Sequence, residues 1–81
     1  MKIIVIGSHL CPDTIYALCK LKENKVDFDF KDISSSFPAL KEYLNIRETN
    51  PIYEEVKNKG GLGIPCFLKD EKVTLNLDDI L

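Results

Sequence analysis

A cysteine stands at the point where an apolar run gives way to residues that suit the start of a helix. The run Lys2–Gly7 is rich in β-branched side chains, and Cys11 follows it, immediately before Pro12. Proline suits a first helical position, because the N–H group that it lacks would have no partner there. The free N–H groups at a helix start carry a partial positive charge, which favours a thiolate. We therefore predict that Cys11 is a nucleophile; the alternative is a small residue buried at the strand–helix junction.

The chain contains three cysteines, Cys11, Cys19 and Cys66. An odd number argues against a fully paired disulfide framework. The spacing fits no zinc site, since there is no C-x-x-C pair and His9 is the only histidine. We therefore expect no metal, and we expect Cys19 to lie in the core, on the inner face of the first helix.

The composition is that of a small globular protein. Its 81 residues suffice for one domain, 1–81, with 44% hydrophobic residues, 30% charged residues and a formal net charge of −2. No basic patch interleaves with aromatic residues, so we expect no nucleic-acid partner. The longest apolar run, Ile3–Ile6, is too short to span a bilayer, and no signal-peptide pattern is present. We therefore expect a cytoplasmic monomer with no membrane partner.

Hydrophobic periodicity and turn residues predict alternating strands and helices. The predicted elements are a strand at 2–6, a helix at 12–24, a strand at 26–33, helices that begin after Ser36 and Asn50, strands at 64–68 and 72–77 joined by a hairpin at 69–71, and one helical turn at 78–81. On the first helix, Ile15, Leu18 and Cys19 form the expected inner stripe. On the third helix, Ile52 and Val56 are expected to face inward. The order β-α-β-α-α-β-β-α predicts an α/β fold with a four-stranded mixed sheet flanked by helices.

Four segments in this order resemble the glutaredoxin family, within the thioredoxin fold. The letters CPDT at Cys11–Thr14 stand where the family carries its C-P-x-C or C-x-x-S motif, and VDFDF at Val26–Phe30 corresponds to its second strand. GIPCF at Gly63–Phe67 matches an apolar residue, a cis-proline and a strand, and LDDIL at Leu77–Leu81 matches the paired acids that open the last helix. The stretch Glu42–Phe67 is longer than in an ordinary glutaredoxin, which suggests an extra helix near 51–59.

The resemblance implies a thiol–disulfide oxidoreductase with a monothiol mechanism. Cys11 would attack a disulfide or glutathionylated protein substrate, and glutathione or another small thiol would regenerate it as co-substrate, with no tightly bound cofactor. Thr14 occupies the place of a second cysteine. Its hydroxyl could donate to the Cys11 sulfur, or it could be an ordinary polar residue of the first turn. Cys66 is a possible resolving thiol, although strand alternation could turn it elsewhere.

The resemblance also implies a glutathione-binding set made of Pro12, Ile64, Pro65, Asp78 and Asp79. The main chain of Ile64 would pair with the cysteinyl part of glutathione, next to Pro65 in the cis form. Asp78 or Asp79 would meet the γ-glutamyl amine; the equal alternative is that these acids cap the last helix.

Two family features have no counterpart in this chain. Where a lysine usually precedes the cysteine, the sequence reads Gly7–His9, and where a glycine pair precedes the acids, it reads Thr74–Leu77. These departures support an alternative function, a redox-inactive binding or regulatory module that keeps the fold. A third possibility is a carrier of an iron–sulfur cluster bound by Cys11 of each of two chains together with glutathione.

Overall fold

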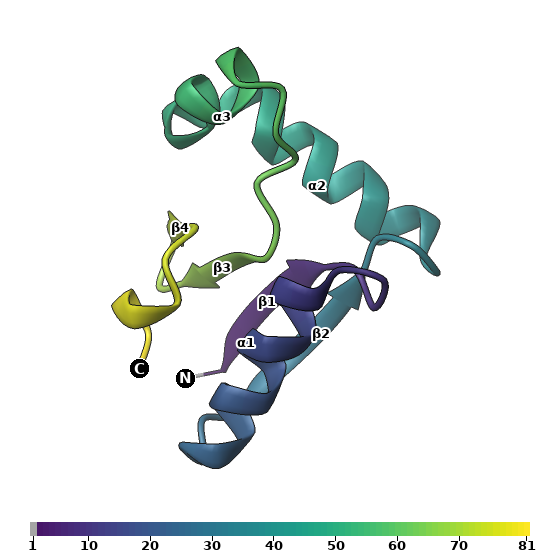
Figure 1. Ribbon diagram of the computed structural model, residues 1–81. Helices are drawn as coiled ribbons and strands as arrows, with labels where there is room; N and C mark the ends of the chain where they lie inside the picture. The colour runs from purple at the N-terminus through teal and green to yellow at the C-terminus, as the bar shows by residue number, and fades with distance from the viewer. Residues whose placement is uncertain (1) are drawn as a thin grey trace.

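The computed structural model describes residues 2–81 and has an α/β fold built on one four-stranded mixed sheet (Figure 1). Its elements are β1 (Ile3–Gly7), α1 (Pro12–Glu23), β2 (Phe28–Asp32), α2 (Phe37–Thr49), the 3-10 turn η1 (Pro51–Tyr53), α3 (Glu54–Asn58), β3 (Cys66–Lys69), β4 (Lys72–Thr74) and the 3-10 turn η2 (Leu77–Asp79). The predicted order of strands and helices is confirmed. The last expected helix is the single turn η2.

The sheet has the strand order β2-β1-β3-β4, so β1 lies between the two halves of the chain. Strands β1 and β2 are parallel, whereas β3 is antiparallel to both β1 and β4. Because β1 and β3 run in opposite directions, the end of β1 lies beside the start of β3, and Ile6 is paired with Cys66. The sheet therefore brings the segment that follows β1 close to the segment that precedes β3.

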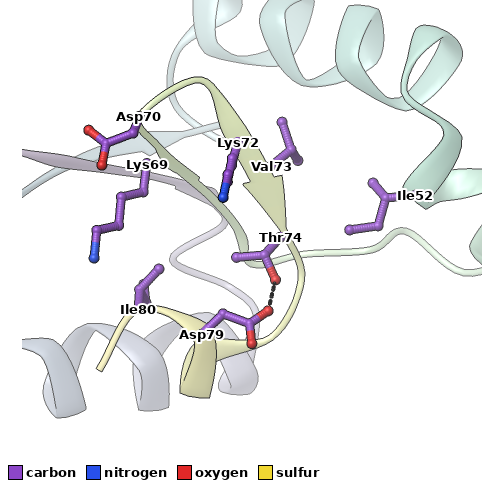
Figure 2. Close-up of a pocket in the computed structure, with 8 residues that line it drawn as sticks. All are labelled: Ile52, Lys69, Asp70, Lys72, Val73, Thr74, Asp79 and Ile80. Atoms are coloured by element: carbon purple, nitrogen blue, oxygen red, sulfur yellow. Dashed lines mark hydrogen bonds between the residues drawn. The ribbon is translucent and has the colours of Figure 1, made fainter.

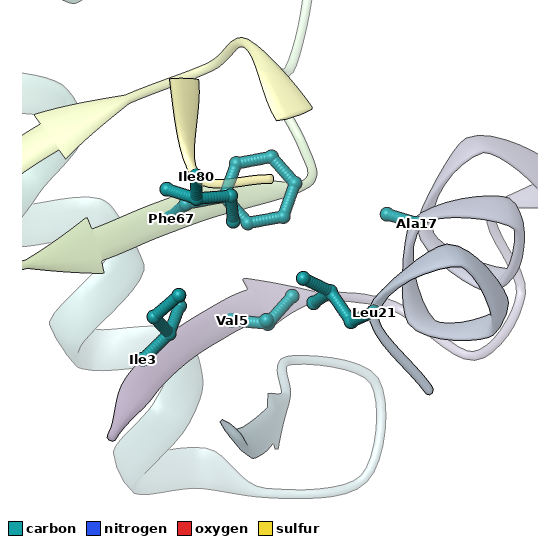
Figure 3. Packing of buried hydrophobic residues seen from close by; sticks show 6 residues of the cluster. All are labelled: Ile3, Val5, Ala17, Leu21, Phe67 and Ile80. Atoms are coloured by element: carbon teal, nitrogen blue, oxygen red, sulfur yellow. The ribbon is translucent and has the colours of Figure 1, made fainter. Parts of the chain in front are cut away.

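Side chains of the central strands alternate between two apolar clusters, one on each face of the sheet. One cluster packs β1 and β3 against α1 and the chain end; it contains Ile3, Val5, Ala17, Leu21, Phe67 and Ile80 (Figure 3). The other packs the opposite face against α2 and η1; its buried members are Ile6, Tyr43, Tyr53 and Cys66. The first strand is therefore buried on both faces of the sheet.

Two predicted helix caps are present with the expected hydrogen bonds. Ser36 Oγ accepts from Ala39 N–H at 3.3 Å and begins α2, while Asn50 Oδ1 accepts from Ile52 N–H at 3.0 Å and begins η1. No helix within residues 2–81 combines the length and the apolar character that crossing a membrane requires.

The prediction of the inner stripe of the first helix was partly wrong, since of its three residues only Leu18 packs against the core. Cys19 is exposed, and so is Ile15, whereas Thr14, Ala17 and Leu21 are buried. The reason is a close approach to the end of β1, where a Cβ on Gly7 would lie 2.6 Å from Thr14 Oγ1. The face of α1 with Thr14, Ala17 and Leu21 therefore packs on the sheet, while Ile15 and Cys19 turn toward solvent.

The expected inward face of the third helix was also partly wrong. Ile52 is exposed, and Tyr53 beside it is completely buried. Residues Pro51–Tyr53 form a 3-10 turn rather than the first turn of the α-helix, which begins only at Glu54. A 3-10 helix has three residues per turn, whereas an α-helix has 3.6. The direction in which each side chain points therefore shifts, and a different residue faces the core.

The burial of α1 predicts which of two neighbouring residues contributes to stability. We expect Leu21→Ala to lower the free energy of unfolding by about 3 kcal/mol, because it leaves a cavity between α1 and the sheet. Cys19→Ala should change it by less than about 0.5 kcal/mol, because the side chain is exposed. Urea unfolding followed by far-UV circular dichroism measures both variants. Equal losses would contradict the orientation of α1.

Candidate functional site

Cys11 lies in the loop between β1 and α1 and is the residue that precedes the first turn of the helix. Its backbone is extended, with φ −96° and ψ 119°. Its N–H donates to Ser8 O at 3.0 Å, and its C=O accepts from Ile15 N–H at 3.1 Å, the first bond of the helix. The Cys11 side chain is half-buried and makes no capping hydrogen bond to the helix. The thiol therefore lies at the amide end of α1 without being fixed to those amides.

Cys11 shares a pocket with the loop that precedes β3. The pocket has a volume of about 480 Å³ and is lined by Ser8, Leu10, Cys11, Ile33, Ser34, Leu62, Gly63 and Ile64. The peptide bond between Ile64 and Pro65 is cis, as the resemblance implies. Two segments that are more than 50 residues apart in sequence thus line the same pocket as the thiol.

Three side chains on the far side of that loop hold its backbone in place. Each donates a hydrogen bond to a different carbonyl of consecutive loop residues: Tyr43 Oη to Leu62 O, Arg47 Nη2 to Gly61 O at 2.8 Å, and Tyr53 Oη to Gly63 O at 2.8 Å. We call Tyr43, Arg47 and Tyr53 the loop clamp. The three residues come from α2 and η1, so the segment near 51–59 contributes directly to the position of the loop.

The tyrosines of the loop clamp are buried and packed edge to face. Their ring centroids are 6.4 Å apart, with an angle of 82° between the planes. Burial raises the pKa of both the Tyr43 and the Tyr53 hydroxyl. Both phenols therefore stay protonated and keep donating to the loop at neutral pH. Neither tyrosine was predicted from the sequence, because no local motif marks a side chain that bonds to a loop elsewhere in the chain.

A second polar network holds the turn that leads into Cys11. Asp32, at the end of β2, accepts hydrogen bonds from the N–H groups of His9 at 3.2 Å and Ser34 at 3.0 Å, and from Ser35 Oγ at 2.8 Å. Its second contact with His9 joins Oδ2 to Nδ1 at 2.6 Å. Desolvation alone would raise the pKa of Asp32, but these hydrogen bonds outweigh it and lower the pKa to about 2.

The same network reaches the residues directly before Cys11. Ser8 is buried, its hydroxyl bonds to the Ser34 hydroxyl, and Ser8 Oγ accepts from Leu10 N–H at 3.0 Å. The turn over Ser8–Cys11 is therefore joined to the β2–α2 loop through both Asp32 and Ser34. Among residues 2–81, no three His, Cys, Asp or Glu side chains gather in a way that could hold a metal ion.

Thr14 points to the end of β1. Its side chain is completely buried, and its Oγ1 accepts a hydrogen bond from Ser8 N–H at 3.4 Å. Among the described residues the Cys11 sulfur is not among its hydrogen-bond partners. Of the two interpretations of Thr14, the geometry matches the polar residue that fixes the first turn, because the hydroxyl positions the start of α1 against the strand.

Cys66 is a core residue on the far side of the cis-proline. It is 1% exposed, lies in the cluster with Ile6 and Tyr53, and does not line the Cys11 pocket. Burial raises the pKa of its thiol, which disfavours the thiolate needed for exchange. This placement argues against a resolving role for Cys66.

The acids of the chain end lie apart from Cys11. Asp79 lines a different pocket, of about 680 Å³, beside β4, and accepts a hydrogen bond from Thr74 Oγ1 at 2.5 Å (Figure 2). Asp78 is exposed, and its N–H donates to Asn76 Oδ1 at 3.1 Å, so Asn76 caps η2. Neither acid lines the Cys11 pocket. Of the predicted site residues, the structure therefore brings Cys11 and Ile64 together in one pocket, with Pro12 and Pro65 as their chain neighbours, but not the acids.

Comparison with known proteins gives one informative relative. The chain is 34% identical over 67 residues to an uncharacterized protein of Haemophilus influenzae, an alignment that spans 83% of this chain and 78% of the relative. The two proteins belong to one family. No protein-family model matches the chain, and no solved structure matches it. Since the name of this relative states no activity, the function of the family is argued from the geometry of the site.

The contact between the loop and Tyr53 predicts unequal effects at two glycines. Gly63 has φ +71°, and a Cβ there would overlap the Tyr53 ring, whereas Gly60 has φ +73° with nothing within 4 Å. Gly60→Ala should therefore cost about 1 kcal/mol of stability, from backbone strain alone. Gly63→Ala should cost about 2 kcal/mol more, because it also overpacks the core. Urea unfolding compares the two variants, and equal costs would contradict the packing of Tyr53 on the loop.

The network around Asp32 predicts a pH-dependent contribution to stability. An ordinary Asp has a pKa near 3.9, and the folded value is about 2, so the ionised carboxylate stabilises the fold above about pH 4. That contribution decreases as the pH falls from about 4 to 2. The stability difference between the wild type and Asp32→Asn should shrink over this range in urea titrations. The control is Asp27→Asn, which alters an exposed side chain; a difference for Asp32→Asn that stays constant from pH 7 to 2 would refute the assignment.

Proposed function

We propose that the protein is a thiol–disulfide oxidoreductase of glutaredoxin type, with a thioredoxin-like fold. The support for this fold is a parallel β1–β2 pair joined through α1, followed by an antiparallel β3–β4 hairpin that adds to the same sheet. The order and directions of these strands agree with those that the resemblance implies. The CPDT motif follows the end of β1, and the GIPCF motif leads into the start of β3. These two strand ends are paired, and both motifs contribute to the Cys11 pocket.

The observation that carries the proposal is the shared pocket of Cys11 and Ile64. A nucleophilic thiol needs an open approach for a second sulfur and a wall that positions the substrate. Cys11 is half-buried at the amide end of a 12-residue helix, whose field favours a negatively charged sulfur. Ile64 supplies the facing wall, and the loop clamp holds that wall in position.

The proposed reaction is a pair of thiol–disulfide exchanges. The Cys11 thiolate attacks one sulfur of a substrate disulfide; a new bond joins that sulfur to Cys11, and the other sulfur leaves as a thiolate that takes up a proton. A small thiolate then attacks the sulfur held by Cys11, and the Cys11 thiolate leaves. For a glutathionylated protein, the products are the reduced protein and a disulfide of the two small thiols. A single reactive cysteine suffices for these two exchanges, in keeping with the burial of Cys66.

A small thiol is the co-substrate of this reaction, and glutathione is the one that the resemblance implies. Ile64 lies where its main chain could pair with the thiol's peptide backbone. Asp78 and Asp79 lie away from this pocket, so the γ-glutamyl contact assigned to them has no support in the arrangement of side chains. The two acids lie in the first turn of η2, but the residue that caps this turn is Asn76, so neither Asp78 nor Asp79 has the capping role of the alternative interpretation.

The second candidate function is a binding or regulatory module that has lost turnover. Its specific support is that the Cys11 sulfur receives no capping hydrogen bond from α1 among the described residues. Such a module would keep its interactions in a Cys11→Ala variant, whereas the proposed enzyme would lose all turnover. An iron–sulfur carrier would need two chains, and a colourless protein after anaerobic reconstitution would exclude it.

Exposure to bis(hydroxyethyl) disulfide, a small neutral oxidant, tests the proposal. We expect Cys11 to form the mixed disulfide roughly tenfold faster than Cys19, although Cys19 is the more exposed thiol, because only Cys11 lies at a helix start. Intact mass and peptide mapping measure the rate at each site. Cys11→Ser should abolish thiol-dependent turnover of the disulfide.

The matched control for that experiment is Cys19→Ser, which should keep full turnover because it removes a thiol from the solvent-facing side of α1. Faster modification of Cys19 than of Cys11, or turnover that survives in Cys11→Ser, would reject the oxidoreductase.

A further inference from the structure

The pocket around Cys11 is apolar and carries no charge. None of its eight lining residues has a charged side chain, and the polar ones are Ser8, Ser34 and Cys11 itself. Two of the apolar lining residues are largely open to solvent: Leu10 is 74% exposed and Leu62 is 60% exposed. The Cys11 thiol thus shares its pocket with two leucines whose apolar surface is buried only when something binds there.

Four cations that could bind a carboxylate have other partners in the structure. Arg47 donates to the Gly61 carbonyl, Lys59 pairs with Glu55 at 2.8 Å, and Lys57 lies 4.0 Å from Glu54. Lys31 is bound to Glu42 at 2.7 Å. Glutathione carries carboxylate and ammonium groups at neutral pH, and each would lose water on entering an uncharged pocket without gaining a partner.

We propose that the disulfide substrate of Cys11 is carried by a polypeptide segment with apolar residues on both sides of its cysteine, in preference to free glutathione. This inference rests on the proposed thiol–disulfide exchange and specifies its substrate. Leu10 and Leu62 contact the side chains that flank the substrate cysteine, and the neutral lining places no charged group opposite them. The occupant must also bring a sulfur electrophile, since Cys11 lines the same pocket as the two leucines.

The substrate preference is expressed in the first thiol–disulfide exchange. The Cys11 thiolate attacks the sulfur of the peptide cysteine, a Cys11–peptide disulfide forms, and the original S–S bond breaks. The former partner of the peptide leaves as a thiolate and takes up a proton. No electrons enter or leave in this step, so its rate reports how well the pocket accepts the peptide.

Activated mixed disulfides with a common leaving group measure this preference directly. Three probes carry the same thiopyridone: a short peptide with valine and leucine beside its cysteine, the same peptide with glutamates at those places, and glutathione. The release of thiopyridone is followed by absorbance in a Cys19→Ser background, which removes the other exposed thiol. We expect the apolar peptide to react at least about tenfold faster than glutathione, which corresponds to roughly 1.4 kcal/mol of transition-state stabilisation.

Two variants assign the preference to the pocket. The double variant Leu10→Ser/Leu62→Ser alters exposed side chains, so the fold should remain, and the apolar peptide should lose most of its rate advantage over glutathione. The matched control is Leu44→Ser, which removes an exposed leucine outside the pocket and should leave all three rates as in the wild type.

The outcomes separate this inference from the function on which it rests. If glutathione or the glutamate peptide reacts as fast as the apolar peptide, or if the preference survives in the double variant, the substrate class is wrong and the oxidoreductase stands. If no probe reacts with Cys11 faster than an unfolded control peptide containing a single cysteine, the oxidoreductase itself fails and the inference fails with it.

Discussion

Three hydrogen bonds from the loop clamp to consecutive carbonyls are the constraint on which the site depends. The loop at 61–63 has no regular secondary structure, and its partly buried carbonyls need donors to offset the loss of water. Two buried phenols and a guanidinium provide these donors from α2 and η1. The backbone of this loop, which lines one side of the Cys11 pocket, is thus held in place by residues that do not line the pocket themselves.

The other wall depends on contacts of a different kind. At the end of β1 the absence of a side chain on Gly7 lets Thr14 approach, and this brings the first turn of α1 against the sheet. The turn before Cys11 is then held by the carboxylate of Asp32, which remains ionised far below neutral pH. Close packing on one side and charge-assisted hydrogen bonds on the other fix the position of the thiol.

The neutral character of the pocket follows from where the charged groups are used. Arg47 and Asp32 both lie close behind the pocket, yet each is bound to a backbone group of the loop that it holds. The loops therefore present backbone and apolar side chains to the thiol, while the charges that position them face away. An uncharged pocket beside the Cys11 thiol is a consequence of this arrangement.

Local rules in the sequence determined the strand–helix junction at Cys11 and Pro12 and the caps at Ser36 and Asn50, because each involves only residues that are neighbours along the chain. The resemblance added the cis-proline at Pro65. Together these predicted the order of elements and two of the residues that line the pocket, Cys11 and Ile64.

Only the tertiary structure decided the rotation of the helices and the use of the polar residues. The sequence alone placed Cys19 and Ile52 inside, but a contact between Thr14 and Gly7 and a 3-10 turn that buries Tyr53 set the actual phase. Hydrophobic periodicity counts apolar residues on one element, whereas helix rotation depends on how closely that element approaches a partner from elsewhere in the chain. For the same reason the loop clamp could not be predicted from the sequence, because its donors and acceptors are up to 19 residues apart.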